Sequence, residues 1–337
     1  MIIADDANDN EQHVNNLADE LNKLKNQSVL AVMGHYASDL TSEVIQKYSD
    51  NELVLISFGS TSENKEKRFL NRDDYFFRTV PGVTYHVDKL IKYIEKEGYK
   101  NPAIFYNESS DFSKSVYNKF IEKFKDKIGN INPELVFKGD NENNNSFAGK
   151  NFNSENEVNN AEDADVLILF PDGQTSQSMY NAIEIMKANQ GRKPIIGTWT
   201  LRNNRFLEAA KDNPEWVIEE KLVVYSPYFF DNNDNKQYVE QANALWGDAS
   251  SPRTALSYDA AWVLINAFLK TNNLNRQTLQ ETLNNMETVQ GGATGDITFD
   301  DNGNRNNLPG LLLEVKANTN NKETGLKFVP LSENGSP

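Results

Sequence analysis

Cysteine is absent from the 337-residue sequence, and histidine occurs only three times. Without cysteine there are no disulfides, thiol nucleophiles or thiolate metal sites, while the redox compartment stays open. His13, His35 and His86 are far apart in sequence, so a histidine metal site would need the fold to bring them together. The longest apolar runs, residues 29–33 and 166–170, are far below the roughly 18 residues that a membrane-spanning helix needs. No membrane-spanning helix is expected.

Positive charge is scarce relative to negative charge. The chain has 34 Lys and Arg against 49 Asp and Glu, which gives a formal net charge of −15. On average such a protein repels a phosphate backbone or an anionic membrane surface, so neither nucleic acid nor direct membrane insertion is expected. Residues 1–6 lack the positive and apolar stretches of a secretory signal, so we expect that an export signal either lies upstream of this chain or does not exist.

Short apolar runs alternate with longer amphipathic stretches along most of the chain. This alternation is typical of βα units and predicts a mainly parallel sheet. Residues 11–25 carry apolar side chains at helical spacing, whereas residues 165–170 are almost wholly apolar, as in a strand buried on both faces. Residues 139–162 are polar and indicate a long loop that leads into a short helix. The other expected strands are 1–4, 29–34, 53–57, 102–106, 134–138, 194–197 and 223–228, with a hairpin of 296–299 and 310–315 around a turn at 300–303.

Motifs of known catalytic and phosphate-binding sites are missing. The sequence has no G-x-G-x-x-G, no G-x-x-x-x-G-K-[ST], no G-x-S-x-G and no H-E-x-x-H. Residues 300–304 have some calcium-loop character but lack the required Glu, so a plain turn is expected. We predict no catalytic residue, no cofactor and no metal, and an α/β enzyme is the least favoured class of function.

Two successive loops combine glycine, serine and threonine where strands are expected to end. Residues 34–39 read Gly-His-Tyr-Ala-Ser-Asp, and residues 57–62 read Ser-Phe-Gly-Ser-Thr-Ser. In a parallel sheet both loops emerge at the carboxyl edge, where small ligands bind, and each leads into a helix whose first N–H groups are unpaired. A helix N-terminus with the hydroxyls of Ser38, Ser60 and Thr61 suits a carboxylate. The alternative is that these residues only cap helices.

Three motifs, in residues 34–41, 55–62 and 77–81, resemble those of the type I periplasmic solute-binding proteins, the leucine/isoleucine/valine-binding class of ABC importers. They read GHYASDLT, LISFGSTS and FRTVP, and their order and spacing fit the family without a gap. The resemblance covers almost the whole chain, because the family's later motifs also match. Residues 112–115 resemble its Tyr-Gly-x-Gly turn, residues 245–247 and 253–260 its late helix, and residues 295–300 its C-terminal strand.

The resemblance implies an α/β fold with two doubly wound parallel-sheet lobes, joined by three crossovers and closing on a ligand like a hinged clamp. The first expected lobe comprises residues 1–80 and 228–288, and the second comprises residues 81–227 and 289–337. Family members begin with a further strand and helix before the strand that here contains Met1. We therefore expect an N-terminally truncated chain.

The resemblance also implies a ligand site. In amino-acid binders of the family, the ligand's α-carboxylate takes the backbone N–H and hydroxyl at the position of Ser38 and the N–H at that of Thr61. The ammonium meets the carbonyl at Gly59 and the hydroxyl of Thr61. An aromatic side chain at the position of Phe112 closes over the ligand from the second lobe.

One departure from the family bears on the ligand. The loop after strand 194–197 commonly carries an acidic residue that neutralises the ligand's ammonium, but here it reads Thr-Trp-Thr. An unpaired buried charge costs several kcal/mol, so either Asp172 on the neighbouring loop takes this role or the ligand has no ammonium. Trp199 could provide an apolar or cation–π wall for the ligand, or pack in the core.

The function implied by the resemblance is non-enzymatic binding of a small polar solute for delivery to an ABC permease. An amino acid or related carboxylate is the expected ligand, and the expected location is periplasmic or otherwise extracytoplasmic. The alternative is a ligand-sensing domain of a signalling protein with the same clamp fold.

Overall fold

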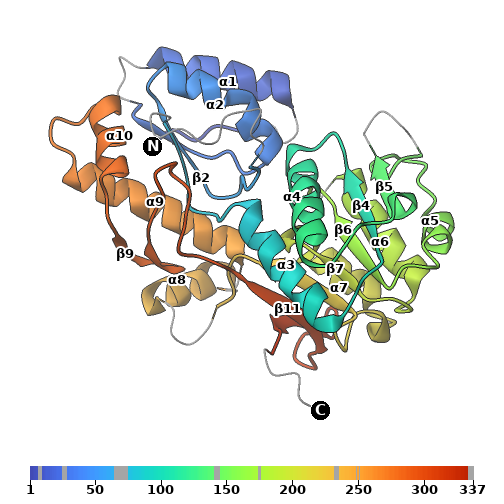
Figure 1. Cartoon of the computed structure of the whole chain (residues 1–337). Coiled ribbons are helices and arrows are strands. Elements are labelled where there is room, and N and C mark those ends of the chain that lie inside the picture. The colour runs from blue at the N-terminus through green and yellow to red at the C-terminus, as the bar shows by residue number, and fades with distance from the viewer. Residues whose placement is uncertain are drawn as a thin grey trace. The chain divides into compact units, whose positions relative to one another are not determined.

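The chain divides into two compact units, Met1–Gly82 with Pro227–Pro309 and Val83–Ser226 with Gly310–Pro337, so the backbone passes between them three times. Both units combine helices with a sheet that contains parallel strands, which confirms the predicted α/β fold. The computed structural model (Figure 1) describes residues 1–6, 10–24, 29–63, 75–139, 145–173, 176–230, 235–247, 249 and 251–332.

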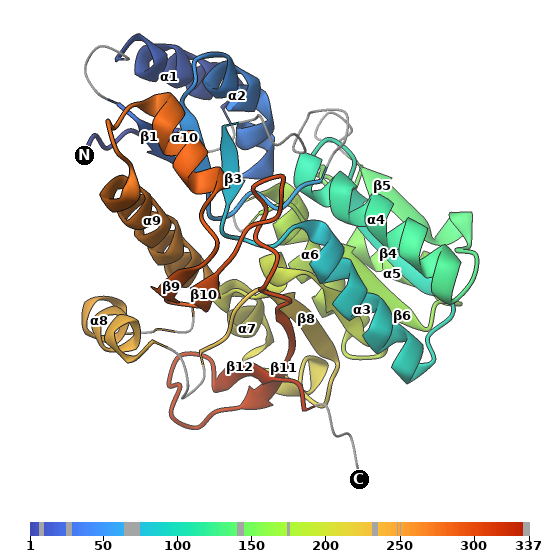
Figure 2. The same ribbon diagram turned by 60° about the vertical axis from the view of Figure 1, so that its left-hand side comes forward.

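A three-stranded parallel sheet in the order β1-β2-β3 forms the centre of the first unit. Helices α1 and α2 pack together on one side of it, and α9 and α10 lie on the other side (Figures 1 and 2). An antiparallel pair, β9 and β10, completes the described part of the unit together with α8. The bounds are α1 (Glu11–Lys23), β1 (Ala31–Met33), α2 (Ser38–Asp50), β2 (Val54–Ser57), β3 (Phe76–Arg78), α8 (Lys236–Trp246), α9 (Pro252–Lys270), α10 (Arg276–Asn284), β9 (Val289–Gly292) and β10 (Gly295–Ile297).

The middle strand β2 is buried on both faces because its successive side chains point to opposite sides of the sheet. Leu55 packs with Val44 in the core beneath α1 and α2. Val54 and Ile56 pack with Val263 in the core beneath α9 and α10. Burial of each such side chain contributes about 1.5–3 kcal/mol, so this short sheet is stabilised from both sides.

Residues 1–6 do not form the strand that the sequence predicts for Met1–Ala4. The side chains of Met1, Ile2 and Ile3 are exposed, and among the described strands β1 pairs only with β2. A strand requires a neighbour that pairs with its backbone N–H and C=O groups. Residues 1–4 have the apolar composition of a strand but pair with none of the described strands.

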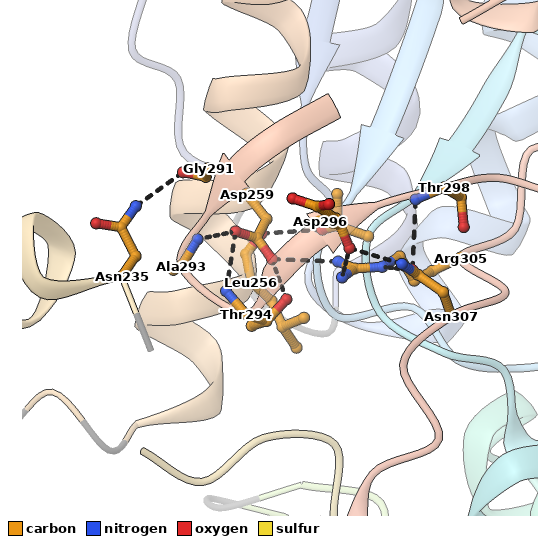
Figure 3. Close-up of polar contacts among 11 residues, drawn as sticks. Asn235, Leu256, Asp259, Gly291, Ala293, Thr294, Asp296, Thr298, Arg305 and Asn307 are labelled. Carbon is orange, nitrogen blue, oxygen red and sulfur yellow. Dashed lines mark hydrogen bonds and ion pairs between the residues drawn. The ribbon is translucent and has the colours of Figure 1, made fainter. Parts of the chain in front are cut away.

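Residues 289–309 belong to the first unit, whereas the sequence predicts them for the second lobe. Val289 and Ile297 lie in the core beneath α9 and α10. Arg305 forms an ion pair with Asp259 of α9, with 3.2 Å between Nη1 and Oδ2 and no exposure of either side chain (Figure 3). Apolar packing and a buried charge pair thus hold this stretch on the first unit.

The predicted hairpin of residues 296–299 and 310–315 does not form. β10 pairs with β9, whereas β11 (Leu311–Ala317) pairs with β8 (Leu222–Ser226) in the other unit. The turn at residues 300–303 is present, since the Gly303 N–H donates to the Asp300 carbonyl over 3.0 Å. β11 lies antiparallel beside the fully buried β8, and this pairing satisfies its backbone groups.

The second unit contains a seven-stranded mixed sheet in the order β12-β11-β8-β7-β6-β4-β5. Its first two strands are antiparallel and the other five are parallel. β6 lies between β4 and β7 and is fully buried, which confirms the predicted buried strand. Helix α3 packs beside α4, and α5 beside α6 (Figure 2). The remaining bounds are α3 (Val83–Glu97), β4 (Pro102–Asn107), α4 (Asp111–Lys127), η3 (Pro133–Leu135), β5 (Val136–Gly139), α5 (Ser154–Asn160), β6 (Val166–Phe170), α6 (Gln177–Asn189), β7 (Ile195–Gly197), η4 (Trp199–Leu201), α7 (Asn204–Ala210), η5 (Pro214–Trp216) and β12 (Leu326–Pro330).

None of the helices in the described ranges combines the length and apolar character needed to cross a membrane.

Candidate functional site

Helix α2 begins at Ser38 without a side-chain cap. Its N-cap residue is Ala37, whose methyl group cannot accept a hydrogen bond. Ser38 is the first helical residue, and its Oγ accepts the backbone N–H groups of Thr61 at 3.2 Å and Ser62 at 3.3 Å. Ser38 therefore joins the two glycine- and serine-containing loops instead of capping its own helix, and the positive end of the α2 dipole lies at their junction.

Two acceptor bonds leave the Ser38 hydroxyl with one proton to donate, and no acceptor for that proton is found among the described residues. The Thr61 N–H, which the family resemblance assigns to a ligand carboxylate, points at Ser38 Oγ instead. The hydroxyl of Ser38 thus accepts the hydrogen bond that this N–H could otherwise donate to a ligand. In a chain of hydrogen bonds each member polarises the next, so the Ser38 O–H becomes a stronger donor.

The loop after β2 is folded around Ser57. Its Oγ donates to the His35 carbonyl at 2.6 Å and accepts the N–H groups of Gly59 at 3.3 Å and Ser60 at 3.0 Å. Gly59 is required here because a Cβ at this position would overlap the ring and the carbonyl oxygen of Tyr36. Local hydrogen bonds and a close backbone approach therefore fix the loop next to the start of α2.

Two further hydroxyls in this loop lack partners. The side chains of Ser60 and Thr61 are fully buried, and neither Ser60 Oγ nor Thr61 Oγ1 has a hydrogen-bond partner within the described part of the chain. A buried polar group without a partner costs about 1–3 kcal/mol. Together with Ser38, three hydroxyl groups at one helix N-terminus can donate to an acceptor that the described residues do not supply.

An aromatic and cationic group flanks the same loop. The guanidinium Nε of Arg253 donates to the Tyr36 hydroxyl at 2.7 Å and its Cζ lies 5.0 Å from the centre of the Tyr36 ring. The ring of Phe58 is also close to that of Tyr36, with 6.1 Å between the two ring centres. Burial raises the pKa of Tyr36, and the charge of Arg253 acts against this rise. The Tyr36 side chain is therefore neutral, and it is held in a fixed position beside Gly59.

The other three residues of the predicted site belong to the second unit. Strand pairing places the carboxyl ends of β4, β6 and β7 side by side, because Tyr106 pairs with Phe170 and Leu169 with Gly197. The residues that follow these strands include Phe112 on α4, Asp172 after β6 and Trp199 on η4. All three therefore lie at one edge of the seven-stranded sheet, and Phe112 and Trp199 are buried.

Asp172 is held in place by neighbouring side chains. The Asn107 amide donates to its Oδ2 at 2.6 Å, and the Ser178 hydroxyl donates to its Oδ1. Ser178 Oγ in turn accepts the Asp172 N–H at 3.1 Å. These bonds fix the carboxylate but leave lone pairs on both oxygens for a further donor.

Sequence reasoning did not assign any role to Arg78, Tyr36 or Arg253. The only available signal was an arginine at the end of the otherwise apolar strand β3, within the motif Phe-Arg-Thr-Val-Pro. Arg78 is almost fully buried, and its Nη1 donates to the carbonyls of Ser60 and Ser62. Long-range contacts such as these cannot be derived from sequence spacing.

The family model described as "receptor family ligand binding region" matches residues 1–317. The chain belongs to this family. No curated protein matched the sequence.

Solved structures share the fold of this receptor-family ligand-binding region at low sequence identity. An ABC transporter substrate-binding protein from Desulfitobacterium hafniense in complex with leucine has 19% identity and a TM-score of 0.71, with 97% of this chain and 88% of that chain covered. The branched-chain amino acid transporter substrate-binding protein from Streptococcus pneumoniae in complex with isoleucine has 18% identity and a TM-score of 0.72, covering 98% and 87%. A solute-binding protein of an ABC transporter from R. palustris in complex with benzoate has 14% identity and a TM-score of 0.71, covering 95% and 82%. These likenesses show that the receptor-family chain has the type I periplasmic binding fold.

Proposed function

We propose that the protein is a non-enzymatic solute receptor that binds a small carboxylate and delivers it to an ABC permease outside the cytoplasm. The observation that carries this proposal is a group of hydroxyl donors at the N-terminus of α2, those of Ser38, Ser60 and Thr61, for which the described part of the chain holds no acceptor. A carboxylate supplies several lone pairs and a negative charge, which matches both these donors and the helix dipole.

The ligands of the similar structures agree with this chemistry. Leucine, isoleucine and benzoate have a carboxylate in common and otherwise differ in their amine and their apolar part. We propose that the carboxylate is held by the first unit at Ser38, Gly59, Ser60 and Thr61. The second unit would contribute Phe112 and Trp199 as apolar contacts and Asp172 as the only acid of this set.

A thermal-shift series tests the proposal directly. We expect at least one of L-leucine, L-isoleucine and benzoate to raise the melting temperature, since a ligand that binds only the folded state stabilises it by about 2.7 kcal/mol at 100 times its Kd. The matched amides, L-leucinamide and benzamide, should have no such effect because they lack the carboxylate. Equal shifts with acid and amide, or no shift with any of the acids and a wider set of short carboxylates, would refute the proposal.

Asp172 decides between zwitterionic and purely anionic ligands. Replacing Asp172 by Asn removes the charge that could neutralise an ammonium, so the affinity for L-leucine should fall about tenfold, as expected for loss of a charged hydrogen bond. The affinity for benzoate should not fall, because benzoate has no ammonium. Isothermal titration of both ligands measures the difference.

Ser178→Ala serves as the control for this substitution. It removes both hydrogen bonds between the Ser178 hydroxyl and Asp172 but keeps the negative charge. The ratio of the leucine and benzoate affinities should therefore stay at its wild-type value. If Asp172→Asn also leaves this ratio unchanged, Asp172 has only a structural role.

A further inference from the structure

The buried side chain of Arg78 forms hydrogen bonds with the loop after β2, which carries Ser60 and Thr61 of the candidate site. The side chain extends from the end of β3 and is only 1% exposed. Its Nη1 donates to the Ser60 carbonyl at 3.2 Å and to the Ser62 carbonyl at 2.8 Å. The two carbonyls flank Thr61, so one guanidinium fixes both ends of the segment that carries the unpartnered hydroxyls.

The Ser60 carbonyl and the Thr61 N–H belong to the same peptide group. A proton donor on this carbonyl therefore orients and polarises this N–H, which donates to Ser38 Oγ at 3.2 Å. The resulting chain of hydrogen bonds runs from the guanidinium through one peptide group to the hydroxyl of Ser38. Its last member is the Ser38 O–H, whose proton has no acceptor among the described residues.

The main chain of Arg78 is itself held firmly. Its N–H donates to the Gly303 carbonyl at 3.0 Å, and its carbonyl accepts the Arg305 N–H at 3.1 Å. Arg305 is in turn paired with the buried Asp259 (Figure 3). The backbone from which the Arg78 side chain extends is thus held in place by hydrogen bonds. The guanidinium is planar with fixed donors, so it loses little conformational freedom when it binds two carbonyls.

We propose that Arg78 is a positioning residue of the carboxylate site, which orients the Ser60–Thr61 peptide group and through it the Ser38 hydroxyl. As far as ligand affinity is concerned, this inference rests on the proposed function. The positive charge of Arg78 also favours an anion at this junction. Its nearest described counter-charge is Glu63, at 3.8 Å from Nη2.

A second buried arginine in the same unit provides a matched comparison. Arg276 is 4% exposed and also donates to two backbone carbonyls, those of Val29 at 2.8 Å and Asn51 at 2.9 Å. These carbonyls precede β1 and β2, at the amino ends of the strands. Arg276 therefore has the same chemistry as Arg78 but lies at the opposite edge of the sheet.

The test compares Arg78→Lys with Arg276→Lys in the full chain by amide hydrogen exchange. Lysine keeps the charge but cannot reproduce the planar fork. We expect Arg78→Lys to speed exchange of the Thr61 and Ser62 amides at least about tenfold relative to the Leu55 amide of β2, because their segment loses its anchor. Arg276→Lys should leave this ratio unchanged. Equal ratios in the two variants would overturn the proposal.

A measurement on the wild-type protein covers the case in which Arg78→Lys does not fold. If both carbonyls hold the guanidinium, its Nη protons should give separate, slowly exchanging NMR signals. Rapid rotation and exchange of these protons would overturn the proposal.

Binding supplies a third readout, with L-leucine and benzoate as probes. Arg78→Lys should weaken whichever probe binds by about tenfold, and Arg276→Lys should not change the affinity. Equal affinities of wild type and Arg78→Lys would overturn the proposal. If the wild type binds no carboxylate at all, the proposed function fails, and the exchange rates still decide the role of Arg78.

Discussion

Replacing Arg305 by methionine is expected to lower the free energy of unfolding by about 3–5 kcal/mol, because it leaves the charge of Asp259 buried without its partner. Both side chains have no solvent exposure, and Asp259 would keep only the donors of Ala293 at 2.6 Å and Thr294 at 2.5 Å (Figure 3). The side chain of Arg305 also donates to the Asp296 carbonyl at 2.9 Å. Urea unfolding monitored by circular dichroism measures the loss.

An exposed ion pair in the same chain is the control. Lys187 and Glu184 lie one helical turn apart on α6, with 2.7 Å between Nζ and Oε1 and with 45% and 51% of their side chains exposed. Lys187→Met should change the stability by less than about 1 kcal/mol, since water screens such a pair. If the two methionine variants cost the same, the buried pair contributes nothing beyond a surface contact.

The loss in Arg305→Met should also depend on pH. Burial raises the pKa of Asp259, and Arg305, Thr294 and the Ala293 N–H all act to lower it. Without Arg305 this pKa rises further above that of the unfolded chain, where Asp titrates at about 3.9. A carboxyl with a raised folded pKa binds its proton more tightly in the folded state, so its contribution to stability is lost as pH rises toward that pKa. The variant should therefore lose less stability at pH 5 than at pH 8.

The sequence correctly predicted those strands whose position follows from a short run of apolar residues. The apolar run ending at Phe170 gave a buried strand, and the strand ending at Ser57 was placed within a residue. Prediction was wrong where the outcome depends on pairing with distant residues. Met1–Ala4 has a strand-like composition but no strand partner, and the segment after Asp300 joins a sheet of the other unit instead of a hairpin.

For the candidate site, too, the sequence predicted the local features but not the contacts between distant residues. Glycine, serine and threonine at the ends of two neighbouring parallel strands indicate a ligand edge, because parallel strands place their carboxyl ends together. Spacing alone could not distinguish a helix cap from a ligand group at Ser38, since both need a hydroxyl at the start of a helix. In the structure Ser38 does not cap α2, and its hydroxyl accepts from Thr61 and Ser62, which lie more than 20 residues away in sequence. Arg78 acts over a similar separation, and its contacts depend on the folded arrangement of β2 and β3.

Thr61→Val should change ligand affinity and protein stability in opposite directions. The Thr61 hydroxyl is fully buried without a partner among the described residues, so its removal relieves an unsatisfied polar group. The free energy of unfolding of the ligand-free protein should stay the same or rise by up to about 1 kcal/mol. The affinity for the carboxylate found in the thermal-shift series should fall by about 1–3 kcal/mol, because the ligand loses a charged hydrogen bond. Urea unfolding and isothermal titration measure the two changes.

Thr79→Val is the matched control, because this threonine is equally buried but its Oγ1 donates to the Leu256 carbonyl at 2.9 Å. Its replacement removes this buried hydrogen bond and should lower the stability by about 0.5–1.5 kcal/mol while leaving ligand affinity unchanged. The two valine variants thus exchange their effects: one loses binding and keeps its stability, and the other loses stability and keeps its binding. A Thr61→Val protein that is destabilised like Thr79→Val and binds the carboxylate normally would mean that the Thr61 hydroxyl serves the fold. The loop after β2 would then not be the ligand site.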